Sequence, residues 1–179
     1  MPIRTITVKS TAEMPSQYSL AITVDMVEKH VTPDHPPRLR VTVTNQSSRR
    51  IKIGDGYGKV FSAPASRNPG PGLLLLSSDG QIPKKSGCWQ PVMELAMPAV
   101  LNFAALEAGE SDSIEYEIWA KPDNSLSNCY ALGEYSFKTE YHHIDTDDLE
   151  IEESGDECDS ERFEWGFTLT VRNENKRHC

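Results

Sequence analysis

The sequence predicts an all-β protein in which two antiparallel sheets, with roughly seven to nine strands between them, pack face to face as a sandwich. Apolar side chains recur at every second residue in several short segments, which is the spacing of one strand face. Segments rich in proline, glycine and serine separate these runs about every 8–12 residues, as in sandwiches. The 179 residues, of which 37% are hydrophobic, suffice for one domain with a single core.

Two neighbouring stretches indicate the type of sandwich. In Ala131–Tyr141, bulky side chains stand at every second position after Gly133, a residue that permits a tight turn into a strand. In Leu106–Trp119, apolar residues alternate with glutamates from position 114 to 118. The two resemble the E and F strands of an immunoglobulin-like sandwich, and Tyr135 holds the position of a tyrosine corner. We therefore expect an immunoglobulin-like fold in which Gly133, Trp119, Tyr135 and Trp165 are signature residues.

The other segments follow in order. We expect an N-terminal edge strand and linker over residues 1–17, the sandwich over 18–172 with an acidic loop at 145–161, and a flexible tail at 173–179. Residues 92–103 are expected to be mostly extended, because prolines at both ends oppose a helix. Further strands are expected at residues 3–9, Tyr18–Lys29, Arg38–Asn45, Ile51–Ile53, Lys59–Ser62, Leu73–Leu76 and Phe163–Val171.

Charge and hydropathy exclude some classes of partner. The net charge is −9, from 27 acidic and 18 basic residues, which disfavours nucleic acid and anionic lipid surfaces. No stretch approaches the roughly 20 apolar residues of a membrane span. The first residues, MPIRTITVKS, have no apolar core, so no signal peptide is expected. The location stays open: cytoplasmic by default, or extracytoplasmic if the protein carries a disulfide.

Four cysteines, at positions 88, 129, 158 and 179, allow three pairings or four free thiols. We favour a bond between Cys88 and Cys129, because both lie just outside predicted strand ends on the same side of the Leu106–Trp119 stretch. Cys158 lies in the acidic tract and Cys179 ends the tail, so these two are expected to be free or loosely paired. The absence of a CxxC motif disfavours a zinc-finger site.

Possible metal ligands gather after the central strand. His142, His143, Asp145 and Asp147 offer nitrogen and oxygen donors at the start of a tract with ten carboxylates in seventeen residues. Glu150 stands where an EF-hand loop requires glycine, so that motif fails. The alternative is a solvated loop whose like charges repel, with the two histidines as surface residues.

Other site chemistry is weakly indicated. The sequence has no G-x-S-x-G elbow, and no glycine-rich phosphate loop followed by a helix, so we expect neither an enzyme nor a bound cofactor. GDGYG at residues 54–58 is interpreted as a bend in a strand. Trp89, Trp119 and Trp165 could line a sugar-binding face, although core packing is the favoured interpretation for them.

Two resemblances rest on these segments. The pattern RLRVTVTN at 38–45, LEAGES at 106–111, EYEIW at 115–119 and ALGEYSF at 131–137 is similar to the immunoglobulin-like intracellular proteinase inhibitor domain of bacteria. Closer still, Thr32–Asn45, Gly87–Trp89, Cys129–Phe137 and Glu164–Val171 resemble a group of uncharacterised immunoglobulin-like proteins from halophilic archaea. The resemblance covers about residues 18–171, implies the fold, and brings no catalytic residues to carry over.

The expected function is a non-catalytic immunoglobulin-like binding or accessory module, with a protein as a possible partner. The sequence leaves the ligand and the oligomeric state open. One alternative is a proteinase inhibitor that acts through an exposed loop, for which Ala63–Gly72 is the candidate. The other alternative is a metal-binding protein.

Overall fold

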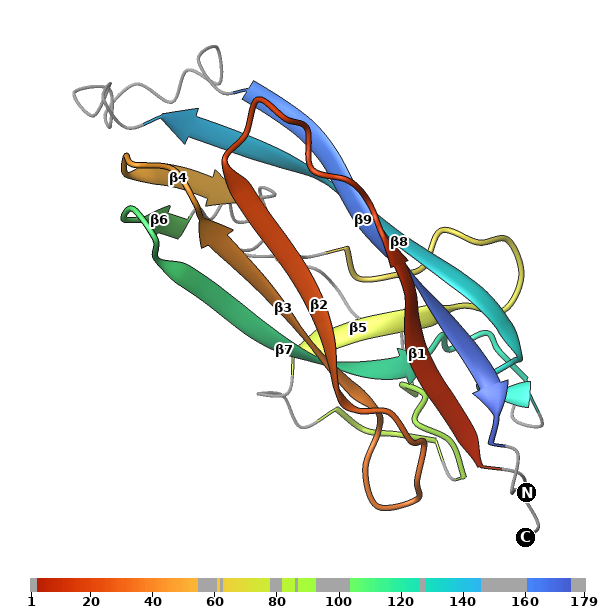
Figure 1. Ribbon diagram of the computed structural model, residues 1–179. Coiled ribbons are helices and arrows are strands. Elements are labelled where there is room, and N and C mark those ends of the chain that lie inside the picture. Colours follow the sequence, from red (N-terminus) through yellow and green to blue (C-terminus); the bar gives the residue numbers. More distant parts are fainter. Residues whose placement is uncertain are drawn as a thin grey trace, which may run out of the picture.

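The computed structural model describes residues 3–54, 61, 63–77, 82–85, 87–92, 104–125, 128–145 and 161–174, with only the backbone at residue 145. Its strands form two antiparallel sheets, one with the order β1-β9-β8-β4-β6 and one with the order β2-β3-β7-β5. Figure 1 shows them as two layers. The predicted all-β class with two antiparallel sheets is confirmed. The strands are β1 Arg4–Thr11, β2 Leu20–Glu28, β3 Arg38–Asn45, β4 Ile51–Gly54, β5 Leu73–Ser77, β6 Ala104–Leu106, β7 Ser111–Ala120, β8 Gly133–Asp145 and β9 Glu161–Asn173.

Alternation of side chains set the register of the long strands. In β3 and β9 the odd-numbered apolar residues face the core, and the charged residues between them face away from it; Thr170, on the outward side of β9, is buried. The pair β8–β9 runs from Gly133 opposite Val171 to His143 opposite Glu161, which is the longest pairing in the described chain. A slip of one residue would move the apolar side chains of the slipped strand from the core face to the solvent face, so this register is strongly specified.

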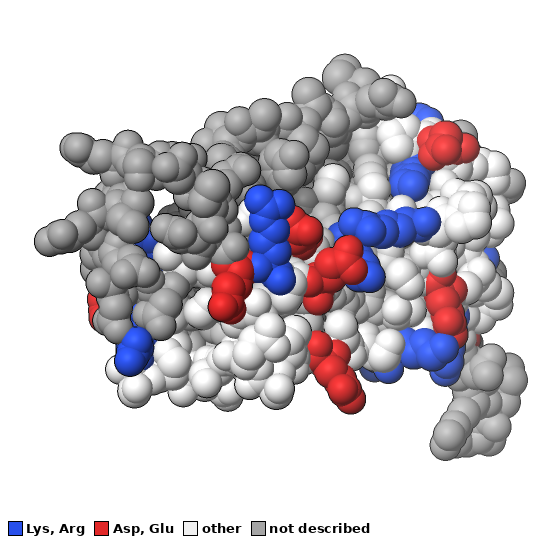
Figure 2. Space-filling model, turned by 90° about the horizontal axis from the view of Figure 1, so that it is seen from above, with Lys and Arg blue, Asp and Glu red and all other residues white. Residues whose placement is uncertain are grey.

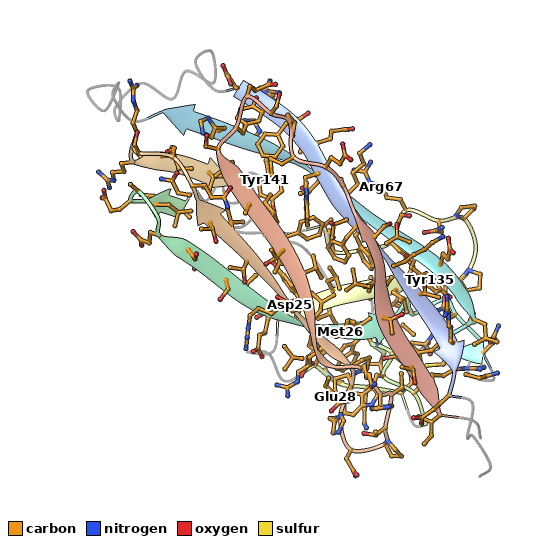
Figure 3. The ribbon with its side chains drawn as sticks, viewed as in Figure 1. Asp25, Met26, Glu28, Arg67, Tyr135 and Tyr141 are labelled. Atoms are coloured by element: carbon orange, nitrogen blue, oxygen red, sulfur yellow. A yellow bond between two sulfur atoms is a disulfide. The ribbon has the colours of Figure 1, made fainter. Side chains whose placement is uncertain are left out.

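The core between the sheets is rich in aromatic rings. Phe61 lies 5.1 Å from the ring of Phe167 and meets Trp165 edge to face at 6.0 Å. Tyr141 stacks on Phe163 at 5.4 Å between ring centres. Figure 3 shows Tyr135 and Tyr141 between the two layers, where both are buried. These rings come mainly from β8 and β9, and aliphatic side chains of β2, β3, β5 and β7 face them from the other sheet.

Asn45 fastens one end of the sandwich. Its Nδ2 donates to the carbonyl oxygens of Arg49, Leu106 and Glu107 at 2.7, 3.0 and 3.1 Å. Its Oδ1 accepts hydrogen bonds from the amide and the hydroxyl of Ser47 at 3.0 and 2.7 Å. The side chain is fully buried, so these bonds replace the water that it loses. One amide therefore joins the turn after β3 to the turn between β6 and β7.

Charged side chains on the outer face of the five-stranded sheet form ion pairs with one another. Lys138 of β8 lies 2.7 Å from Glu164 of the neighbouring strand β9. Lys9 of β1 lies 2.6 Å from Glu134 of β8, on the far side of β9. Figure 2 shows basic and acidic side chains interspersed over the described surface in that view. Such exposed pairs contribute about 0.2–1 kcal/mol each and keep the face solvated.

The structure differs from the sequence-based expectation at two positions. Leu106 does not continue the Trp119 strand: it belongs to β6, in the other sheet, and the turn at Gly109, with a φ of 78°, separates them. Trp119 faces away from the core, because Ile118 and Ala120 on either side of it face inward. The expected N-terminal edge strand is present as β1.

Some expected segments lie outside the described residues. These are the bend at GDGYG beyond Gly54, most of Lys59–Ser62, residues 93–103, the acidic loop after Asp145 and the tail after Glu174. In the described part of the chain, no helix is long and apolar enough to cross a membrane.

Candidate functional site

A disulfide lies at the end of the sandwich opposite to Asn45. Cys88 and Cys129 are bonded, with their Cα atoms 6.2 Å apart and a sequence separation of 41. Both are buried. The predicted bond is confirmed, and it ties the segment after β5 to the connection between β7 and β8. Cys158 and Cys179 lie outside the described residues.

Two buried amides join the same segments to the loop before β5. Asn124 donates through Nδ2 to the carbonyl oxygens of Gly72 and Cys129 at 2.9 and 3.0 Å, and its Oδ1 accepts the Gly72 amide. Gln90 donates through Nε2 to the carbonyl oxygens of Lys121 and Asn124. Neither side chain was singled out from the sequence. Gln90 directly follows the GCW motif, and that adjacency is the one signal that pointed to it.

Trp89 covers the outer face of the four-stranded sheet at this end. Its ring meets the ring of Trp119 edge to face at 5.4 Å, and its Nε1 donates to the carbonyl oxygen of Thr32 at 2.7 Å. Trp119 is therefore buried although it faces away from the core, and its own Nε1 donates to Glu117. The ammonium of Lys84 lies 3.6 Å from the centre of a Trp89 ring. Trp165 packs in the core, as favoured from the sequence. Trp119 packs on Trp89, which is itself partly buried against the core.

We call the described residues of 30–37, 82–92 and 121–132 the disulfide end. The disulfide, the two amides and Trp89 lock these three segments to one another and to the sheets. Exposed side chains on them are of mixed character. Pro33, His35, Lys84, Val92 and Leu132 are exposed, and Val92 and Leu132 are the most exposed large apolar residues of the described chain at 48% and 52%. Asp34 and Asp123 are exposed on the same segments, so the arrangement can present a fixed surface with apolar, basic and acidic groups to a macromolecule.

Tyr135 and Tyr130 anchor the disulfide end to the core. The hydroxyl of Tyr135 donates to the carbonyl oxygen of Ala131 at 2.6 Å, and the hydroxyl of Tyr130 donates to that of Ile118 at 2.7 Å. Burial raises the pKa of the Tyr135 hydroxyl, and it raises the pKa of Tyr130 more strongly. Gly133 has a φ of 145°, which side chains rarely tolerate, so the turn into β8 requires glycine.

The Ala63–Gly72 loop lies against both sheets. The amide of Ser66 donates to Leu73 and that of Leu75 donates to Pro64, so the start of the loop covers the free edge of β5. Further on, the amide of Arg67 donates to the carbonyl oxygen of Ser136 in β8 at 2.9 Å. The exposed tip comprises Arg67, Pro69, Gly70 and Pro71.

The candidate metal ligands do not converge in the described chain. The ring of His143 lies 5.0 Å from that of buried Tyr18, whereas the Nε2 of His142 lies 3.9 Å from Glu140. Consecutive residues of a strand point to opposite faces, so the two imidazoles are directed apart. Asp147 and the Asp145 side chain lie outside the described residues, within which no group of three or more metal-binding side chains forms.

The geometry therefore defines a class: an all-β, two-sheet sandwich with one disulfide-fastened end. No protein-family model matches the chain, and the search of curated proteins found no match.

Proposed function

We propose that the chain is a non-catalytic immunoglobulin-like module that binds a protein partner through the disulfide end. The strand order supports the immunoglobulin-like assignment. The sheet β2-β3-β7-β5 corresponds to strands A-B-E-D, and β9-β8-β4 corresponds to G-F-C. β1 and β6 are then additions at the two edges of the second sheet. The hydrogen bond from Tyr135 to Ala131 supports the same assignment, because it has the form of a tyrosine corner.

One observation carries the binding proposal: three segments distant in sequence are locked together at the disulfide end. The bond between Cys88 and Cys129 joins residues 82–92 to 121–132, and the indole of Trp89 joins residues 82–92 to 30–37. The side chain of Asn124 joins residues 121–132 to Gly72 in the loop before β5. Loops that are already ordered lose little conformational entropy on binding, so their contacts convert more fully into affinity. Loops on a rigid sandwich are also where such folds carry recognition. The disulfide further supports a location in an oxidising compartment.

The experiment is site-specific photo-cross-linking in cells that express the chain. A photoreactive residue replaces exposed Val92 at the disulfide end, and as a control replaces Lys138 on the self-paired outer face. The proposal expects one cross-linked protein with Val92 and none with Lys138. Lys84→Glu, which reverses an exposed charge next to Trp89, should abolish that cross-link. Equal products at both positions, or none at either, contradict the proposal.

A second candidate function, proteinase inhibition, is favoured by the bracing of the Ala63–Gly72 loop. The amide of Arg67 donates to Ser136, and the Oδ1 of Asn68 accepts the Ser136 amide at 2.7 Å. A loop that is fixed by hydrogen bonds and exposes an arginine suits a trypsin-like serine protease. Against this, the Arg67 amide is already used within the protein. Inhibition of a serine-protease panel by the intact chain, lost in Arg67→Ala, tests it; no inhibition at micromolar concentration removes it.

A further inference from the structure

β2 lies at the edge of the four-stranded sheet. Bonds of the neighbouring residues show which of its backbone groups point toward β3 and which point away from the sheet. The amide of Gln46 donates to Ser19 at 2.8 Å, and the amide of Asn45 donates to Glu110, on the opposite side of β3. Hydrogen-bonded pairs recur at every second residue of an antiparallel ladder. Continuing from Leu20 opposite Asn45, the bonds to β3 therefore come from residues 21, 23 and 25. The amides and carbonyls of Leu20, Ile22, Val24 and Met26 point away from the sheet.

A bulge ends this free edge. The register of β2 against β3 shifts between Met26 and Glu28, which reverses the parity of the residues that follow. The carbonyl oxygen of Lys29 accepts the amide of Ile6, and the amide of Val31 donates to Arg4, so β1 occupies the edge from Lys29 onward. Within the described chain, no such backbone bond reaches the outward groups of residues 22, 24 and 26. Figure 3 labels Asp25, Met26 and Glu28 along this part of β2.

We propose that this edge pairs with the same edge of a second copy of the chain, antiparallel, about a two-fold axis at Val24. Ile22, Val24 and Met26 form the middle of this outward row, and Leu20 stands at its start. An axis at Val24 sets Val24 opposite Val24 and Ile22 opposite Met26, and it leaves the outward groups of Leu20 unused. An axis at Thr23 would use them, but it would set the carboxylate of Asp25 opposite Ala21, which has no side-chain donor. Each pair about the axis at Val24 exchanges two hydrogen bonds in an antiparallel ladder. The pairing joins the two four-stranded sheets into one continuous sheet.

Side chains match on both faces in this register. On the inner face Val24 and Met26, which are only partly buried in the single chain, meet apolar partners. On the outer face the hydroxyl of Thr23 lies opposite the carboxylate of Asp25, to which it can donate. A register centred on Asp25 would instead oppose two carboxylates, which is unfavourable. The net charge of −9 opposes association, so we expect the dimer to strengthen as salt screens that repulsion.

Cysteine cross-linking tests the register. In a Cys158→Ser, Cys179→Ser background, Val24→Cys places two thiols directly across the two-fold axis, with Cα atoms about 5.5 Å apart. We expect an intermolecular disulfide on mild oxidation. Asp25→Cys is the matched control, because its thiol lies opposite Thr23 and remains unpaired. Cross-linking through Asp25→Cys overturns the proposal. Cross-linking through neither variant also overturns it, and this is the result expected if a strand of another protein occupies the edge.

Val24→Pro tests the backbone bonds. The outward amide of Val24 takes no part in the β3 ladder, so proline at this edge position should leave the circular dichroism spectrum unchanged. Loss of that amide from both copies should raise the dimer dissociation constant about 10- to 100-fold in sedimentation experiments. Thr23→Val, on the same strand, should keep the dimer. A wild-type chain that stays monomeric at high concentration and high salt overturns the proposal.

Discussion

The hydroxyl of Tyr135 donates a 2.6 Å hydrogen bond to the carbonyl oxygen of Ala131, four residues earlier in the chain. This bond spans the turn by which the chain enters β8 from the disulfide end. Tyr135→Phe leaves the ring in place but removes the hydrogen bond to the carbonyl oxygen of Ala131. It should therefore lower the free energy of unfolding by about 1–2 kcal/mol. Chemical denaturation measures this. Ser136→Ala, at the exposed neighbour, should change stability by no more than about 0.5 kcal/mol; equal stability of both variants contradicts the assignment.

Alkaline pH should destabilise the protein through two buried phenols, those of Tyr130 and Tyr135. Burial raises the pKa of Tyr130 and Tyr135 in the folded state, so the unfolded chain loses these protons first. Their contribution is fully present below the unfolded pKa of about 10 and is lost as pH rises above it. Tyrosinate absorbance should show phenols that ionise only together with unfolding. Tyr130→Phe should flatten the alkaline branch of stability against pH, and an unchanged branch contradicts this cause.

Asn45→Asp should be severely destabilising at neutral pH, although it barely changes the volume. A carboxylate there faces the carbonyl oxygens of Arg49, Leu106 and Glu107 without a donor for them. The cost should be about 3–5 kcal/mol, as for other uncompensated buried charges. The new carboxyl has a raised pKa in the folded state, so the deficit should shrink as pH falls through that pKa. A deficit independent of pH in thermal melts argues against buried charge as its cause.

Removal of the disulfide should lower stability without releasing Trp89. Cys88→Ser together with Cys129→Ser opens a ring with a sequence separation of 41, for which chain entropy predicts a loss of about 4 kcal/mol. The indole remains held by Thr32 and Trp119, so its fluorescence below the unfolding transition should be unchanged. Treatment of the wild-type chain with reductant is the control and should give the same loss. A melting temperature insensitive to reductant contradicts the prediction.

Gly166 and Gly70 should respond very differently to alanine. A Cβ atom on Gly166 would collide with the carbonyl oxygen of Phe137 in the neighbouring strand β8, so Gly166→Ala should cost about 3 kcal/mol. Gly70 has open space around it and a φ of 85°, so Gly70→Ala should cost only about 1 kcal/mol from backbone strain. Denaturant midpoints of the two variants compare them directly. Equal losses would show that backbone strain, and not the strand contact, sets the cost.

The sequence predicted those parts of the fold that depend on a period of two. The inward faces of β3 and β9 follow directly from alternation, and Cys88 and Cys129 are bonded as predicted. Trp119 escaped prediction because a strand pattern does not say whether a loop will cover the outer face. Asn124 and Gln90 escaped it because their partners are backbone carbonyls, which carry no signature in the sequence.

The two ends of the sandwich are fastened by different chemistry. Asn45 holds one end through an uncharged amide, whereas the other depends in part on a covalent bond that a reductant can break. Reduction should accordingly divide the molecule into a protected half and a fraying half, with amide exchange accelerating near Cys129 and staying slow near Asn45. Substitutions in the loops beside Trp89 can therefore change the exposed surface of the disulfide end, while the strand register stays fixed by the opposite end.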